Sequence, residues 1–259
     1  MAKLMCPKFY KSIWASKLSR QNSMKTLVIL HGWQSSKEKW QKVKENIESD
    51  EIEVIVPDLP GFKPETELKK PWTLDNYVEW LKDFSQDKEK FFLLGHSFGG
   101  RVAIKFATRY PEKLYGVILV SAAGIKKPPS FFQKFLKSGA RLVKKLKIEE
   151  IPQTKGLWKI FKKIFYRYIL RKTDYLEASG FLKDTIKNVL EEDLTPLLKE
   201  IKVPVLILWG EKDKITPLTD AYLIRKEIKL SQLEILPGVG HTPHLENPEL
   251  LAQKIKSFV

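Results

Sequence analysis

The stretch Gly95–Gly100, which reads GHSFGG, decides the fold of this chain. It follows a run of four apolar residues, Phe91–Leu94, and it precedes a helical pattern from Arg101 to Tyr110. A serine between small residues, placed between a strand and a helix, is typical of a nucleophile held on a tight and strained turn. The flanking glycines stand where a side chain would collide with the crowded backbone. The helix that follows would direct its N-terminal N–H groups at developing negative charge. We therefore expect Ser97 to be a nucleophile, provided that an acid and then a histidine follow along the chain.

Short apolar runs alternate with helical patterns over most of the chain, which predicts βαβ units and a parallel sheet. Several runs are continuous in Val, Ile and Leu, as expected of strands that helices cover on both faces. We predict strands at Thr26–Leu30, Glu53–Val56, Phe91–Leu94, Tyr115–Val120, Val203–Trp209 and Gln232–Leu236. We predict helices at Lys37–Ile47, Leu74–Phe84, Arg101–Tyr110, Leu218–Ile228 and Pro248–Phe258. The fold class is therefore α/β, with a mostly parallel central sheet flanked by helices.

The alternation breaks between Ile125 and Leu198, where no convincing strand pattern occurs. Apolar residues recur there at spacings of three and four, opposite lysines and arginines, which predicts amphipathic helices. We expect a helical, basic lid at residues 125–198, inserted between two core segments at residues 26–124 and 199–259. The segment at residues 1–25 fits either an amphipathic helix or a short edge hairpin.

Basic residues are concentrated in the predicted lid. The chain has a net charge of +15, and residues 126–172 alone contain 15 basic and two acidic residues. Basic amphipathic helices can contact an anionic membrane or an acidic partner, although a helix that covers a core also needs a charged outer face. No nucleic-acid reader motif accompanies the charge, so we expect no nucleic-acid partner. The oligomeric state stays open.

Cysteine usage and hydropathy limit the compartment and the cofactors. Cys6 is the only cysteine, which excludes an intramolecular disulfide and a zinc site built on several cysteines. No run approaches the roughly 18 apolar residues of a membrane span, and the N-terminus lacks the apolar core of a signal peptide. We expect a soluble, cytoplasmic protein that needs no metal or organic cofactor.

The base that a serine nucleophile requires must come from four histidines. We assign His241 as the general base, because it lies in a loop after the last predicted strand, where an α/β sheet places its site. His244 is the second candidate. Asp213 follows the strand before and would orient the imidazole, with Glu211 as its local competitor.

The oxyanion of acyl transfer needs preorganised N–H donors. The tripeptide His31-Gly32-Trp33 ends the first predicted strand, and its glycine lets the backbone turn and present the next N–H. We therefore expect the backbone N–H groups of Trp33 and Phe98 to form the oxyanion hole. Asp58 also follows a strand, but the Ser97 turn already fills the nucleophile position, so we expect Asp58 to have a structural role in its turn.

These motifs occur in one order along the chain, namely HGW (31–33), DLPGF (58–62), GHSFGG (95–100), GEKD (210–213) and GHTPHLENPE (240–249). From about Thr26 to Val259 the chain resembles the α/β-hydrolase superfamily, with the helical insertion in the place of that family's cap or lid. The resemblance implies Ser97 as nucleophile, Asp213 as acid and His241 as base, with oxyanion donors at Trp33 and Phe98.

The chain departs from the family pattern in two places. The family usually has two more strands before its His-Gly turn, whereas only about 25 residues are available for them here, so this edge is reduced, remodelled or missing. The Pro-Gly-Phe turn continues with Lys63, where a second glycine is common. Neither departure affects the predicted chemistry.

Residue identities within the motifs narrow the reaction. Haloalkane dehalogenases and epoxide hydrolases of this superfamily use aspartate where Ser97 stands, which makes both activities unlikely. Carbon–carbon hydrolases often carry Asn before the serine and Trp after the histidine, where this chain has His96 and Thr242. We therefore expect a serine hydrolase acting on a small-molecule carboxylic ester or a related acyl compound. A carbon–carbon hydrolase, or a binding module that docks its basic lid on an anionic membrane or an acidic partner, is the alternative.

Five aromatic residues of the predicted lid would either line an apolar acyl pocket or only pack the lid against the core. They are Phe131, Phe135, Trp158, Phe161 and Phe165.

Overall fold

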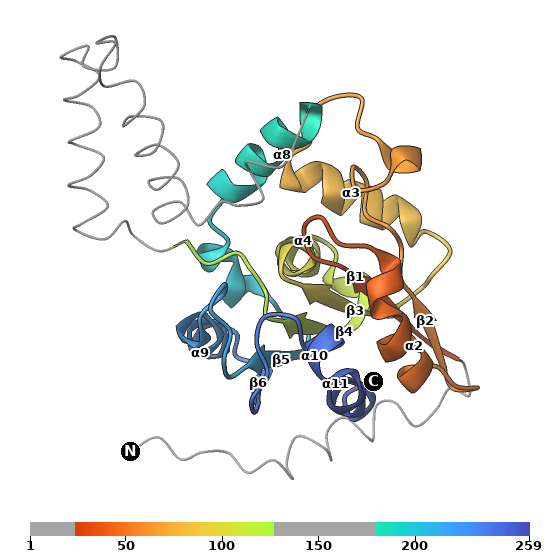
Figure 1. The fold of residues 1–259 in the computed structure, drawn as a ribbon, viewed down its shortest axis with the longest axis vertical. Helices are drawn as coiled ribbons and strands as arrows, with labels where there is room; N and C mark the ends of the chain where they lie inside the picture. Colours follow the sequence, from red (N-terminus) through yellow and green to blue (C-terminus); the bar gives the residue numbers. More distant parts are fainter. Residues whose placement is uncertain (1–23, 127–179) are drawn as a thin grey trace, which may run out of the picture.

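The computed structural model of the protein describes residues 24–126 and 180–259. Within these ranges, six parallel strands form one sheet in the order β2-β1-β3-β4-β5-β6 (Figure 1). The strands are β1 (Lys25–Leu30), β2 (Ile52–Ile55), β3 (Phe91–His96), β4 (Leu114–Val120), β5 (Val205–Gly210) and β6 (Ser231–Leu236). Each predicted strand is present, with its ends shifted by at most two residues, and the predicted α/β fold class is confirmed.

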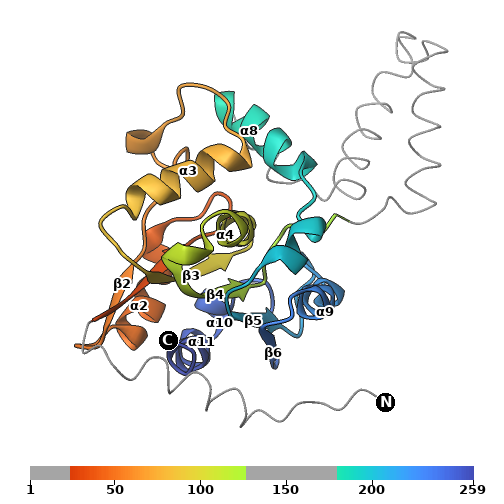
Figure 2. The same cartoon turned by 180° about the vertical axis from the view of Figure 1, so that it is seen from behind.

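Helices cover the sheet on both faces, and Figures 1 and 2 show the two layers from opposite sides. Helices α3, α4 and α9 pack on one face, and α2 and α11 pack on the other. The helices are α2 (Gln41–Ile47), α3 (Leu74–Phe84), α4 (Phe98–Arg109), α8 (Gly180–Glu191), α9 (Leu218–Glu227), α10 (Pro243–Glu246) and α11 (Pro248–Lys256). Short 3-10 turns lie at η1 (Lys37–Trp40), η2 (Pro64–Thr66), η3 (Pro111–Lys113) and η6 (Thr195–Glu200).

The central strand β3 shows why the apolar runs form this sheet. All six of its residues are buried. Phe91 and Leu93 belong to the core beneath α3 and α4, whereas Phe92 and Leu94 belong to the core beneath α2 and α11. Successive strand residues point to opposite faces, so only a continuous apolar run satisfies a strand that is covered on both sides.

The predicted helix Leu74–Phe84 has its predicted bounds, α9 and α11 end one and two residues earlier than predicted, and the other two predicted helices differ more. The predicted helix Arg101–Tyr110 begins earlier, at Phe98, because Gly99 and Gly100 occupy its first turn, packed against neighbouring backbone and against Ala122. The predicted helix Lys37–Ile47 divides into η1 and α2 at Trp40, whose fully buried side chain belongs to the core on the α2 face.

The end of the predicted lid is described from residue 180 onward, and it is tied to the core. Arg101 of α4 donates from Nη2 to the carbonyl oxygens of Val189 and Glu192 at the C-terminal end of α8. The backbone N–H of Trp72 donates to Oγ1 of Thr185, in the middle of α8. The rest of the predicted lid, residues 127–179, lies outside the described residues, as do residues 1–23 of the predicted N-terminal segment.

No helix in the two described ranges is both long enough and apolar enough to cross a membrane. In the same residues, no group of three or more His, Cys, Asp and Glu side chains could hold a metal ion.

Candidate active site

Ser97 lies on the turn between β3 and α4, with φ +50° and ψ −108°. A residue with a side chain adopts a positive φ at an energetic cost, and such strain is concentrated at functional sites. The neighbours leave no space for side chains of their own. A Cβ on Gly95 would lie 2.4 Å from the carbonyl oxygen of Gly99, and a Cβ on Gly99 would lie 2.2 Å from that of Leu30. Glycine is therefore required on both sides of the serine, as the motif predicts.

Three sequence-predicted residues come together at the carboxyl edge of the sheet. Ser97 follows β3, Asp213 follows β5 and His241 follows β6. The Nε2 atom of His241 lies 3.1 Å from Oγ of Ser97, and its Nδ1 atom lies 2.8 Å from Oδ2 of Asp213. The Asp213 side chain is fully buried, whereas the His241 side chain keeps 12% of its surface exposed. The hydroxyl, the imidazole and the carboxylate thus form one continuous line of contacts.

The Asp213 carboxylate is held by its own turn as well as by the histidine. Its Oδ1 atom accepts from the backbone N–H groups of Ile215 and Thr216, at 2.8 and 2.9 Å. Its Oδ2 atom also accepts from the Thr216 hydroxyl at 2.8 Å. Burial alone would raise the pKa of Asp213, but the hydrogen bonds and the neighbouring imidazole outweigh it and the pKa is lowered. The group is therefore a carboxylate at neutral pH.

This carboxylate determines the proton arrangement on His241. An ionised carboxylate only accepts hydrogen bonds, so Nδ1 of the imidazole carries a proton and donates it to Asp213. In the neutral ring Nε2 is then the acceptor, and it faces the Ser97 hydroxyl. This is the tautomer that a general base for Ser97 needs.

The two competing candidates have other contacts. Glu211 accepts from the backbone N–H of Gly238 at 2.8 Å, whereas the carboxylate that meets the imidazole of His241 is that of Asp213. His244 is buried and stacks on Trp40, with ring centroids 4.4 Å apart and planes inclined by 2°. Burial is the main cause that lowers the pKa of His244 to about 3, and its electrostatic interactions with His241, Lys39 and His31 lower it further. The geometry thus favours Asp213 and His241 over Glu211 and His244.

The first histidine and Asp58 organise the loops beside the site. His31 donates from Nδ1 to the carbonyl oxygen of Gly32, and its Nε2 accepts from the backbone N–H of Leu59 at 2.9 Å. Asp58 accepts from the backbone N–H of Lys37 at 3.0 Å. These contacts join the loop after β1 to the loop after β2, which is a structural role for both residues.

The predicted oxyanion donors are Trp33 in the loop after β1 and Phe98, the first residue of α4, which directly follows Ser97. A Cβ on Gly32 would lie 3.5 Å from the Ser97 Cβ, so the backbone that leads into Trp33 passes close to the serine. The ring centroids of Trp33 and Phe98 are 5.2 Å apart. Within residues 24–126 and 180–259, neither residue's backbone N–H is engaged by another backbone carbonyl in the turns and loops. The role of these two N–H groups as oxyanion donors stays a prediction.

Three residues around the site were not predicted from the sequence. Thr216 binds Oδ2 of Asp213 and lies 3.3 Å from Nδ1 of His241. His96 and Glu246 both bind the backbone of the His241 loop. A polar residue three positions after the acid could have indicated Thr216, because short polar side chains often bond across such turns. No comparable local sequence pattern indicates the contacts of His96 and Glu246.

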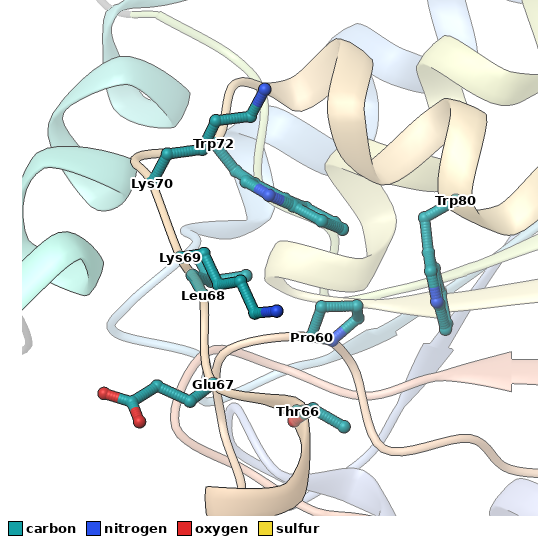
Figure 3. Close-up of a pocket in the computed structure, with 8 residues that line it drawn as sticks. All are labelled: Pro60, Thr66, Glu67, Leu68, Lys69, Lys70, Trp72 and Trp80. Carbon is teal, nitrogen blue, oxygen red and sulfur yellow. The ribbon is translucent and has the colours of Figure 1, made fainter.

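A pocket of about 470 Å³ lies among loop and α3 residues, and Figure 3 shows the rings of Trp72, Trp80 and Pro60 in its wall. It is lined by Pro60, Thr66, Glu67, Leu68, Lys69, Lys70, Trp72 and Trp80. Ser97, Asp213 and His241 are not among its walls, so we assign no reaction to this pocket. The five aromatic residues predicted to line an acyl pocket, Phe131, Phe135, Trp158, Phe161 and Phe165, lie outside the described residues.

The fold and this line of contacts define an α/β hydrolase. The profile of the family described as alpha/beta hydrolase fold matches residues 25–248, and the chain belongs to that family. Pimeloyl-[acyl-carrier protein] methyl ester esterase of Wigglesworthia glossinidia brevipalpis is 30% identical to it, over 90% of this chain and 93% of the relative. Lipase 1 of Psychrobacter immobilis is 27% identical, over 90% of this chain and 76% of the relative.

Solved structures with this fold include a putative lipase (lip1) from Acinetobacter baumannii AYE, with a TM-score of 0.67 and 22% identity over all of this chain and 97% of that one. A thermophilic esterase from Thermogutta terrifontis has a TM-score of 0.65 and 25% identity, covering 91% of this chain and 89% of that one.

Proposed function

We propose that this protein hydrolyses carboxylic esters through an acyl-enzyme formed on Ser97. The observation that carries the proposal is the unbroken line of contacts from the Ser97 hydroxyl through His241 to the buried carboxylate of Asp213. Relatives named lipase, monoacylglycerol lipase and methyl ester esterase support a hydrolase that acts on esters. The serine mechanism is our inference from the geometry.

The acylation step follows from the positions of these groups. Oγ of Ser97 attacks the acyl carbon of the ester while its proton passes to Nε2 of His241. The carbonyl π electrons move to the oxygen, and the N–H groups of Trp33 and Phe98 donate to the resulting oxyanion. The imidazolium is stabilised by the Asp213 carboxylate. When the tetrahedral intermediate collapses, the bond to the alcohol oxygen breaks and His241 returns the proton to that oxygen, which releases the alcohol.

Deacylation repeats the sequence with water as the nucleophile. His241 takes a proton from water as the water oxygen bonds to the acyl carbon, and the same two N–H groups bind the second oxyanion. The bond to Oγ of Ser97 then breaks, His241 returns the proton to Oγ, and the carboxylic acid leaves. Each step uses groups of the chain itself.

Replacement of the nucleophile tests this proposal. We expect Ser97→Ala to abolish turnover of short p-nitrophenyl esters and covalent labelling by a fluorophosphonate, while the melting temperature stays close to that of the wild type. Ser121 provides a matched control, because it also directly follows a strand of this sheet and has a positive φ, of 44°. Ser121→Ala should still be labelled. Retained ester turnover or labelling in Ser97→Ala would disprove the acyl-enzyme assignment.

A further inference from the structure

The loop that carries His241 has no regular secondary structure between β6 and α10. Both ring contacts of the histidine depend on where this backbone lies, because Nε2 must reach Ser97 and Nδ1 must reach Asp213. Loops are usually the more mobile parts of a fold. The active arrangement therefore requires contacts that fix the backbone of this loop.

Glu246 at the end of α10 binds the backbone on both sides of the histidine. Its Oε2 atom accepts from the N–H of Gly240 at 2.6 Å, and its Oε1 atom accepts from the N–H of Thr242 at 3.0 Å. Oε1 also accepts from the Thr242 hydroxyl at 2.8 Å. One carboxylate thus bridges the two residues that flank His241, with each of its oxygens assigned to one side.

The backbone carbonyl group of His241 also has a side-chain partner. A carbonyl oxygen only accepts, so Nε2 of the buried His96 carries a proton and donates it to this oxygen at 2.8 Å. The loop also lies against the end of β5, where a Cβ on Gly210 would come within 2.0 Å of the Gly240 carbonyl oxygen. The loop is therefore in close contact with the end of β5, and its N–H bonds to Glu246 restrain the backbone of Gly240 and Thr242.

The charge state of Glu246 suits this task. Partial burial on its own would raise the pKa of Glu246, but the bonds from Gly240 and Thr242 outweigh it and the pKa is lowered. A carboxylate accepts such charge-assisted bonds at both oxygens, and these bonds are about twice as strong as neutral ones. The residue as a whole is exposed, so we expect its replacement to change the global stability of the fold little.

We propose that Glu246 is a positioning residue for the reaction, which acts by holding the backbone on both sides of His241 so that the imidazole meets Ser97 and Asp213 together. This inference rests on the proposed function of Ser97 and His241. Glu246 touches neither reacting atom in this arrangement, and its effect reaches the chemistry only through the histidine.

Glu246→Gln is the informative substitution. Glutamine keeps the size of the side chain but has one acceptor oxygen, and its NH₂ group would face one of the two backbone N–H donors. We expect kcat to fall by about 10- to 100-fold, because a displacement near 1 Å of a reacting group can cost about 100-fold. KM should change by less than about threefold, since the substrate contacts are elsewhere.

The experiment compares wild type, Glu246→Gln, Thr242→Val and Glu249→Gln on a short p-nitrophenyl ester. Glu249→Gln removes the same charge from an exposed residue of α11 and should behave as wild type. Thr242→Val removes only the hydroxyl bond to Glu246, keeps the backbone bond, and should lose about two- to fivefold in kcat. The low-field proton signal of Nδ1–H in His241 provides a second readout, which should shift or broaden in Glu246→Gln while the melting temperature stays nearly constant.

Each outcome decides the proposal. If Glu246→Gln keeps wild-type kcat and an unchanged low-field signal, the inference is wrong. If its loss of activity only parallels a loss of folded protein, and Thr242→Val is fully active with an unchanged signal, Glu246 is merely structural and the inference is also wrong. Failure of the proposed function is separate, because then the wild type itself would resist fluorophosphonate labelling at Ser97.

Discussion

The two oxygens of Asp213 have different contacts. Oδ1 accepts from the backbone N–H groups of Ile215 and Thr216, whereas Oδ2 faces His241 and also accepts from the Thr216 hydroxyl. A change that keeps the turn but alters what the imidazole meets would therefore isolate the role of the acid from its role in the fold. The motif alone leaves Glu211 as a competitor, because the two carboxylates are two residues apart in one loop. Only the path of the turn decides between them, and that path depends on contacts distant in sequence.

Asp213→Asn tests the orientation of the imidazole. The asparagine amide can present an N–H to Nδ1, which favours the tautomer whose Nε2 carries the proton and cannot accept one from Ser97. We expect kcat for a short ester to fall by about 1,000- to 10,000-fold with little change in KM. Glu211→Gln is the matched control, since Glu211 binds the Gly238 backbone, and it should retain most of the activity. Equal losses in the two variants would argue against the assignment of Asp213.

At the scale of elements, close packing against neighbouring strands determines the conformation of the turn from β3 into α4. Gly99 lies against the backbone at the end of β1, and Gly100 lies against Ala122 after β4. The helix can begin at Phe98 only because both residues lack a side chain. The sequence pattern located the elements, since apolar periodicity records burial. It placed this helix start three residues late, because glycine is read as a turn residue and the neighbouring strands that require it are not local.

Gly99→Ala tests how tightly this element junction is packed. The added methyl group would meet the Leu30 carbonyl oxygen at 2.2 Å, and neither backbone can retreat without disturbing the sheet. We expect the free energy of unfolding to fall by about 3 kcal/mol or more, as for other overpacked or strained sites. Gly180→Ala is the control, because a Cβ there meets nothing within 4 Å and only its φ of +55° is unfavourable. It should cost about 1–2 kcal/mol. Similar losses in urea unfolding would show that backbone conformation, and not close packing, dominates.

At the scale of the whole molecule, the parallel sheet is what makes a site from distant residues. His241 is separated from Ser97 by 144 positions and from Asp213 by 28, yet each follows the carboxyl end of a strand in the same sheet. This part of the site could be predicted, since strand order and direction imply it. The hydrogen bonds that join Glu246 and His96 to the backbone of the His241 loop could not be predicted, because they depend on backbone geometry that no short motif encodes.

The core beneath the site carries a histidine that responds to acid. His244 is buried against Trp40, and its pKa is lowered to about 3, with burial as the main cause. In the unfolded chain the imidazole titrates near the ordinary value of 6.5. Between these two values the unfolded state binds more protons, so stability falls as the pH is lowered through this window. The folded state keeps the His244 ring neutral, so the burial of this ring lowers the stability of the fold in acid.

His244→Phe keeps a ring that can stack on Trp40 and removes the titration. The free energy of unfolding lost between pH 7 and pH 4.5, measured with urea, should be smaller than in the wild type by about 2–3 kcal/mol. His96 and His31 also have lowered pKa values, both with burial as the first cause, so some acid sensitivity should persist. His244→Gln separates stacking from charge, since it should be less stable at both pH values and yet show the same reduced dependence on pH. An unchanged loss in both variants would mean that His244 is already protonated in the folded state at pH 4.5, or that its titration is not linked to unfolding.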